Sequence, residues 1–288
     1  MKEYAIVLLP VPERRALKEA LVWFGDGWRL LKLRLAAWTT YAVVAILALV
    51  MASMTGAVIA RLGGEQPSVW FDVPRLLLVS VVVVAVQAGM YRGMTRIAQG
   101  ESLGQGRGAT IRLEDMGWMF SAPQRKHLLM FAVLMVGFNV LFMQVELWVL
   151  GGQELLVPDA QGQYVMEGAR FSLNEAVFWR YALLMAGYTV LMWMLTWAAV
   201  PLMTLFADVP PARALWLAAD GFAKNVLPLL ALGLLMFLVS VGVGLAIGVV
   251  AGMLQLLAVP LFALFAVWML PLSGAWGYAA CRHVFTDW

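Results

Sequence analysis

Five long stretches of the chain contain no Asp, Glu, Lys or Arg, and they hold most of its apolar residues. These charge-free stretches are 35–60, 76–91, 128–145, 181–207 and 225–281. A helix that crosses the ~30 Å hydrocarbon core of a bilayer needs about 20 apolar residues. The fifth stretch is long enough for two helices joined by a turn. The pattern therefore predicts six transmembrane helices, at about 36–60, 74–91, 128–150, 180–206, 226–249 and 253–280.

These helices define the fold class that the chain is expected to adopt. With six spans in 288 residues, the gaps between spans are too short to fold as globular units of their own. We therefore expect an all-α polytopic membrane protein, in which residues 36–288 form one transmembrane domain of three helical hairpins. Residues 1–35 form an N-terminal segment ahead of this domain.

Ahead of the first span, apolar residues recur every three or four positions, which is the spacing of one face of a helix. The stripe consists of Leu17, Leu21, Phe24, Trp28 and Leu31. Because Lys and Arg lie largely off this face, the segment is expected to rest in the headgroup layer as an interfacial helix. Gly25 and Gly27 predict a bend in its middle. Further juxtamembrane amphipathic helices are predicted at 113–120 and 211–225.

Basic residues are distributed unequally between the two sides of the predicted bundle. Sixteen of the twenty Lys and Arg residues lie in the N-terminal segment, the gaps 92–127 and 208–225, and the C-terminal tail, which all fall on one side. Basic residues favour the cytoplasmic side of short loops, so both termini are expected in the cytoplasm. The net charge of +3 and the pI near 9.1 then indicate contact with anionic lipid headgroups rather than with nucleic acid.

Few residues are suited to cofactor or metal chemistry. Cys281 is the only cysteine, which excludes an internal disulfide, and His127 and His283 are the only histidines. Residues 100–104 match the G-x-S-x-G nucleophile pattern, but their glycine-rich gap lacks the strand–turn–helix context that this motif needs. We therefore expect no metal, no cofactor and no enzymatic activity.

Polar residues are rare within the spans, and three of them form a candidate intramembrane polar site. These are Glu146, Asn139 and Gln87. A carboxylate inside a span favours a proton or cation relay. Glu146 lies near the outer end of its span, where its side chain can reach the interface, so a structural role is the simpler interpretation.

Small residues recur at every fourth position of the fifth span, namely Ser240, Gly244, Gly248 and Gly252. This spacing forms a groove that lets another helix approach closely. The groove is expected to pack against the sixth span. The alternative is an interface with a second copy of the chain or with a membrane-protein partner.

Two segments ahead of predicted hairpins share the pattern Ala-Leu, four residues, and then Asp-Gly-aromatic. They are residues 20–28 and 214–222, and Asp115, Gly117 and Trp118 form a looser third copy. All three lead through basic residues into a span. The chain is therefore interpreted as three units, each an interfacial helix followed by a hairpin.

Three short segments link the chain to a known group of proteins. They are the segment 26–31, which begins Asp-Gly-Trp, the segment with Arg92, Arg96, Gly100 and Glu101, and the segment 206–228 before the last hairpin. These segments resemble those of a loosely defined group of uncharacterised bacterial multi-spanning inner-membrane proteins. The layout is more distantly similar to the membrane domain of some glycerophosphodiester phosphodiesterases, without their catalytic residues. The resemblance implies a bacterial inner membrane as the location, and it implies no activity.

The sequence thus predicts a non-enzymatic membrane component, which is an accessory subunit, an assembly factor or a membrane-stress protein that acts through helix and lipid contacts. Interfacial helices and the small-residue groove favour this function, and no dense polar path crosses the spans. The alternative is a small transporter or channel for a lipid or small solute, because paired hairpins and prolines within spans also occur in transporters.

Overall fold

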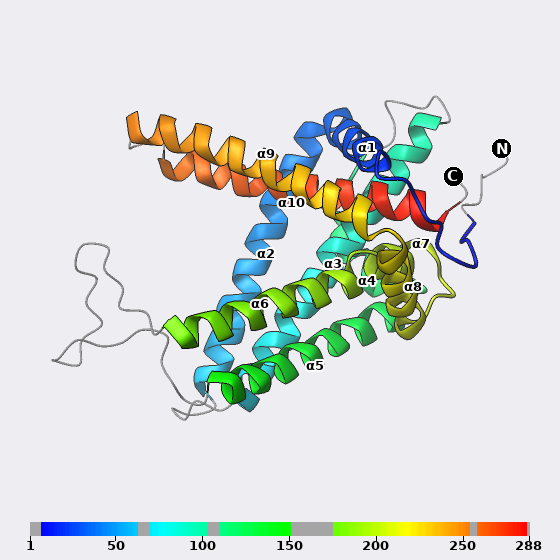
Figure 1. Ribbon diagram of the computed structural model, residues 1–288. Coiled ribbons are helices and arrows are strands. Elements are labelled where there is room, and N and C mark those ends of the chain that lie inside the picture. Colours follow the sequence, from blue (N-terminus) through cyan, green and yellow to red (C-terminus); the bar gives the residue numbers. More distant parts are fainter. Residues whose placement is uncertain (1–6, 63–68, 103–109, 151–174, 254–257, 287–288) are drawn as a thin grey trace.

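The computed structural model of the protein describes residues 7–62, 69–102, 110–150, 175–253 and 258–286. These residues form ten helices, and an isolated bridge between Leu8 and Thr286 is the one strand-like pairing among them (Figure 1). In chain order the helices are α1 (Glu19–Leu33), α2 (Leu35–Leu62), α3 (Val69–Ser102), α4 (Glu114–Ser121), α5 (Arg125–Leu150), α6 (Glu175–Thr196), α7 (Ala199–Leu205), α8 (Pro211–Lys224), α9 (Val226–Met253) and α10 (Ala258–Phe285).

Six segments within these helices are long and apolar enough to cross a membrane. They are Leu35–Val58, Val73–Gly100, Arg125–Val149, Val177–Leu205, Val226–Val250 and Pro260–Phe285. Their mean hydropathy ranges from 1.4 to 2.6, which is typical of transmembrane helices. The predicted fold class, an all-α polytopic protein with six spans, is confirmed.

Consecutive spans pair as three helical hairpins, α2 with α3, α5 with α6, and α9 with α10. In Figure 1 the α9–α10 hairpin lies along the top, the α5–α6 hairpin lies along the bottom, and α2 and α3 run between them. The short helices α1, α4, α7 and α8 lie at one end of this arrangement. We call that end of the bundle the base.

Most of the buried core lies at the base. Its largest fully buried side chains include Trp23 of α1, Tyr41 near the start of α2, Phe131 near the start of α5, and Trp276 and Phe285 near the end of α10. The distal halves of the hairpins expose many of their apolar side chains on the protein surface. Lipid tails are as apolar as these side chains, so a bilayer can cover them without help from another helix.

Two helices are longer than their sequence pattern predicts. The second span is predicted to end at residue 91, but α3 continues to Ser102 and includes Arg92 and Arg96. Both guanidinium groups form ion pairs with Asp115 of α4, whose carboxylate offsets one of the two positive charges, and the helix continues past them. The fifth span, predicted to end at about residue 249, lies in helix α9, which continues to Met253. A helix in lipid keeps its backbone hydrogen bonds satisfied, which favours such continuation.

The fourth span is interrupted at its base end, where Pro201 predicts a kink. Helix α6 ends at Thr196, and Pro201 lies inside the separate helix α7. Proline has no N–H to donate to the carbonyl of Trp197, and its ring crowds that carbonyl. The break between the two helices therefore falls one turn before the proline.

Each short helix that precedes a hairpin packs on the second helix of another hairpin. Helix α1 packs mainly on α10, α4 packs on α3, and α8 packs on α6 and α7. In the two closest copies of the Asp-Gly-aromatic pattern, the glycine packs against an aromatic side chain of α10. Gly27 of α1 faces Trp276, and Gly221 of α8 faces Phe285. A Cβ on Gly117 of the third copy would meet no atom within 4 Å, so the interpretation of the chain as three related units stays a prediction.

The three units form a ring that is open at one seam. Helix α3 of the first unit packs on α5 of the second, and α10 of the third packs on α2 of the first. The remaining pair, α6 and α9, makes no comparable interface within the described residues. The two helices come together near the base, where the ring of Trp193 faces Gly233.

Gly27 lets α1 approach α10 closely. A Cβ at this position would lie 2.5 Å from Cδ1 of Trp276 and 2.9 Å from its backbone nitrogen. Beside it, the indole N–H of Trp276 donates to the carbonyl of Phe24 at 3.0 Å, and the two rings stack. Helix α1 consequently runs through Gly25 and Gly27 without the predicted bend.

We expect Gly27→Ala to destabilise the protein by about 1–3 kcal/mol, because the added methyl group overpacks the contact with Trp276. Gly25→Ala is the matched control, since a Cβ there meets no atom within 4 Å. It should stabilise the helix by about 0.5–1 kcal/mol. Thermal unfolding of the purified variants in detergent measures both effects, and equal stability of the two variants would contradict the close packing.

Candidate functional site

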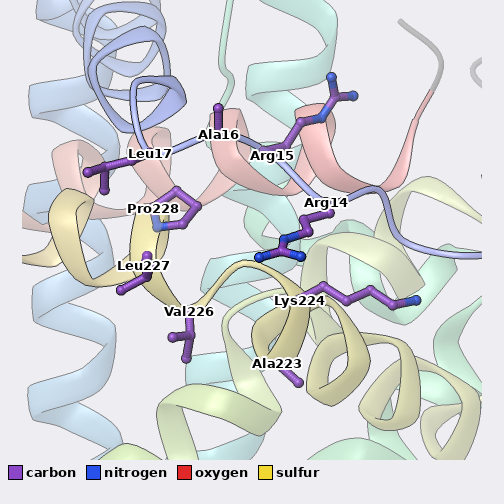
Figure 2. A pocket seen from close by; sticks show the side chains of 9 residues that line it. All are labelled: Arg14, Arg15, Ala16, Leu17, Ala223, Lys224, Val226, Leu227 and Pro228. Carbon is purple, nitrogen blue, oxygen red and sulfur yellow. The ribbon is translucent and has the colours of Figure 1, made fainter.

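A cavity of about 320 Å³ lies at the base, between two segments that are far apart in the sequence (Figure 2). It is lined by residues 14–17 ahead of α1, residues 223–224 at the end of α8 and residues 226–228 at the start of α9. Three cationic side chains and several apolar ones share this lining. The cavity is the candidate functional site of the described chain.

Asn225 holds together the two walls of the cavity, which are the segment ahead of α1 and the corner between α8 and α9. This residue is fully buried at the junction of α8 and α9. Its Oδ1 accepts the backbone N–H of Arg15 at 2.7 Å, and its Nδ2 donates to the carbonyls of Glu13 at 2.8 Å and Gly221 at 2.9 Å. A buried amide is costly unless it is hydrogen-bonded, so these bonds fix the segment ahead of α1 against the α8–α9 corner.

The segment ahead of α1 is also fastened to the end of α10. The backbone N–H of Leu9 donates to the carbonyl of Phe285, and that of Glu13 donates to the carbonyl of Val284, both at 2.9 Å. Leu8 and Thr286 form the isolated bridge. Extended backbone at the beginning of the described chain is thus held by the last hairpin, which positions the side chains of Arg14 and Arg15.

The three cations of the cavity differ in their partners. Arg15 pairs with Glu13 at 2.5 Å, and Lys224 pairs with Asp220 at 2.8 Å. Figure 2 shows these two side chains extending outward, whereas the guanidinium of Arg14 turns toward the first residues of α9. Within the described part of the chain, Arg14 makes no ion pair. The cavity therefore offers one cation that is free to bind an anionic ligand.

A second charged cluster at the base has a structural role. Asp115 of α4 is fully buried and pairs with Arg96 and, at 3.8 Å, with Arg92. Its Oδ2 also accepts the backbone N–H of Arg112 at 2.8 Å. The Arg92 guanidinium lies over the Trp118 ring, 4.9 Å from its centre. These contacts fasten α4 to α3, and they give a physical reason for the two arginines spaced four residues apart.

The intramembrane polar residues do not line this cavity. Asn139 of α5 donates to the carbonyl of Met135 at 2.7 Å and accepts the hydroxyl of Tyr188 of α6 at 3.0 Å. Its amide is therefore engaged in joining the two helices of one hairpin. Glu146 lies farther along α5, and Gln87 lies on α3, each partly buried.

The small-residue groove on α9 is open along most of its length. A Cβ built on Gly244, Gly248 or Gly252 would meet no atom of the described chain within 4 Å. Ser240 donates to the carbonyl of Met236 and touches Sδ of Met269 on α10 at 3.8 Å. The groove thus contacts α10 at Ser240, while its three glycines face outward.

The apolar stripe predicted for the interfacial helix is divided between two surfaces. Phe24 stacks on Trp276 and Leu31 is buried, so both belong to the core of the base. Leu17, Leu21 and Trp28 are exposed, with Leu17 at 59% and Leu21 at 64%. Trp23, which is off the predicted stripe, is fully buried instead. Contact of the exposed part with lipid stays a prediction.

Arg14 and Asn225 belong to the candidate site, and the sequence pattern does not single them out. Their separation along the chain hides their proximity, and Asn225 stands at the edge of a charge-free stretch like many other polar residues. Among the described residues, no three His, Cys, Asp or Glu side chains gather into a metal-binding group.

Comparison of the chain with protein-family models, with curated proteins and with solved structures finds no match. The fold defines the class, which is a multi-pass all-α membrane protein. At the base, the four short helices lie beside the six candidate spans, and a basic cavity lies beside the first turn of α9.

We expect Asp115→Asn to destabilise the protein by about 1.5–3 kcal/mol, because the buried arginine contacts lose their counter-charge. Glu114→Gln is the matched control on the same helix. Glu114 pairs with Arg112 at 3.0 Å on the surface, and exposed pairs contribute about 0–1 kcal/mol. Chemical unfolding of both variants in detergent measures the difference. If Asp115→Asn cost no more than Glu114→Gln, the cluster would not fasten α4 to α3.

Proposed function

We propose that the protein is a non-enzymatic component of a bacterial inner membrane, with both termini in the cytoplasm. It serves as an accessory or assembly subunit, or as a membrane-stress component, through contacts with other membrane helices and with lipid. The observation that carries this proposal is the open seam between α6 and α9 beside the outward-facing glycines of α9.

The open seam between α6 and α9 supports a partner helix, because each of the other two seams of the ring is filled by packing between two helices. At both, the second helix of one hairpin packs on the first helix of the next. Helix α9 is the most apolar span, with a mean hydropathy of 2.6, and it has the smallest buried share of the six. Glycines spaced by four allow another helix to approach its backbone closely. A helix from a partner protein is the occupant that fits this face.

The distribution of basic residues supports the proposed orientation. The base carries Arg14, Arg15 and Lys224 at the cavity and Arg92 and Arg96 beside α4. Positively charged residues are retained on the cytoplasmic side of bacterial membranes. A base on that side would also place the cavity next to the anionic headgroups of the inner leaflet.

A transporter or channel for a lipid or small solute is the alternative function, and the three related hairpins are the observation in its favour. A polar path would bring Glu146, Asn139 and Gln87 to one cavity. Asn139 is instead engaged with Tyr188 in the contact between α5 and α6. The alternative therefore has less support than the accessory function.

Purification of the full chain in mild detergent at native expression level tests the proposal, and we expect a membrane protein to co-purify in stoichiometric amount. Gly248→Leu should lower its recovery at least about tenfold, since the new side chain fills the groove that admits the partner. Gly137→Leu on α5 is the matched control, because Gly137 also has no neighbour within 4 Å, and it should leave the recovery unchanged.

Two results would contradict the accessory function. One is a chain that purifies alone and stays monodisperse. The other is solute or proton flux in proteoliposomes that Glu146→Gln abolishes, which would establish the transporter instead.

A further inference from the structure

We propose that the cavity at the base binds the phosphate of one anionic phospholipid, with Arg14 as the residue that recognises it. This inference deepens the proposed function, since it rests on the membrane location, but it does not depend on a protein partner. It assigns a ligand class to a site that is defined by residues far apart in the sequence.

Charge is the first argument for this ligand. Three cations at the cavity, Arg14, Arg15 and Lys224, face two carboxylates, Glu13 and Asp220, which pair with Arg15 and Lys224. Among the described residues, Arg14 is the one cation of these three that has no carboxylate partner. A phosphodiester carries a single negative charge at neutral pH, so one anionic phospholipid balances the site. The planar guanidinium group can bind two phosphate oxygens at once.

The position of Arg14 is the second argument. Its backbone neighbours are fixed by Asn225, through the N–H of Arg15 and the carbonyl of Glu13. Figure 2 shows its guanidinium lying between the residues of the α8–α9 corner rather than extending away from the protein. The side chain of Arg14 is exposed in this position, so an incoming anion can reach its guanidinium group.

The apolar part of the lining favours a lipid over a soluble anion. Leu17 and Leu227 border the cavity and are 59% and 64% exposed. Val226, also in the lining, is the first residue of a candidate membrane span. The cavity therefore lies where a headgroup meets hydrocarbon, and not in bulk water.

A continuous apolar track leads away from the cavity along α9. Exposed side chains recur on one face at three- or four-residue spacing: Leu227, Leu230, Leu234, Phe237, Val241, Leu245 and Val249. At 1.5 Å per residue this track extends for about 33 Å, which is enough for an acyl chain. A lipid whose phosphate binds Arg14 could thus place its acyl chains along α9, where they would cover the exposed apolar side chains.

Native mass spectrometry of the full chain in detergent tests the site, with phosphatidylglycerol and phosphatidylcholine of identical acyl chains as the probes. We expect Arg14→Gln to weaken the binding of phosphatidylglycerol about fivefold, the effect of about 1 kcal/mol for one cation near an anionic lipid. Arg14→Lys keeps the positive charge, so this variant should lose less affinity for phosphatidylglycerol than Arg14→Gln. Binding of phosphatidylcholine should be the same in all variants.

Arg213→Gln is the matched control, because Arg213 is an exposed arginine of α8 outside the cavity. It should bind phosphatidylglycerol like the unmodified chain. Equal affinities of the Arg14→Gln and Arg213→Gln variants would overturn the proposal, and so would an equal loss of phosphatidylcholine binding in Arg14→Gln.

Glycerol phosphate and inorganic phosphate, added as competitors, distinguish a lipid from a soluble anion. Competition by either one at the concentration of the lipid would show a soluble ligand and overturn the lipid assignment. Because these measurements use the purified chain alone, they can fail while a protein partner still co-purifies, and they can succeed when no partner is found.

Discussion

Within a bilayer, packing apolar side chains of two helices together gains little, because lipid tails are as apolar as the side chains that they cover. The six spans must therefore be held by close backbone contacts, hydrogen bonds and ion pairs. In this chain such contacts gather at the base. Gly27 seats α1 on Trp276, Asp115 binds α4 to α3, and Asn225 joins the α8–α9 corner to the segment ahead of α1. The distal halves of the hairpins, with many exposed apolar side chains, depend on this anchored end for their arrangement.

The charge-free stretches and the spacing of apolar residues were sufficient to predict the fold class and the six spans, because the thickness of the hydrocarbon core and the period of the helix determine where apolar residues occur in the local sequence. Positions that depend on distant partners could not be predicted in this way. Arg92 and Arg96 look like the end of a span until Asp115 is placed beside them. Gly25 and Gly27 predict the same bend, yet a Cβ on Gly25 would meet no atom within 4 Å, whereas Gly27 lies against the indole ring of Trp276. Arg14 and Asn225 could not be linked from the sequence, because the two walls of the cavity, residues 14–17 and 223–228, are far apart in the sequence and meet only in the fold.

Helix α9 connects the two kinds of contact that the protein offers. Its first turn borders the basic cavity, and its later turns present outward glycines next to the open seam. A lipid held at the start of this helix would lie against the face that a partner helix approaches. The two proposals thus place a lipid and a partner helix on the same exposed surface of α9, although each can be tested without the other.

The bonds around Asn225 also have a consequence for the order in which the protein is made. The backbone and side-chain hydrogen bonds of residues 9–15 described above lead to residues 225, 284 and 285. The ribosome produces those partners after residues 9–15, so these residues lack their native contacts until the third hairpin has been synthesised. Closure of the base can occur only after that hairpin is present. A chain whose last hairpin fails to insert leaves this segment unbound, which would distinguish incomplete molecules from finished ones in the cell.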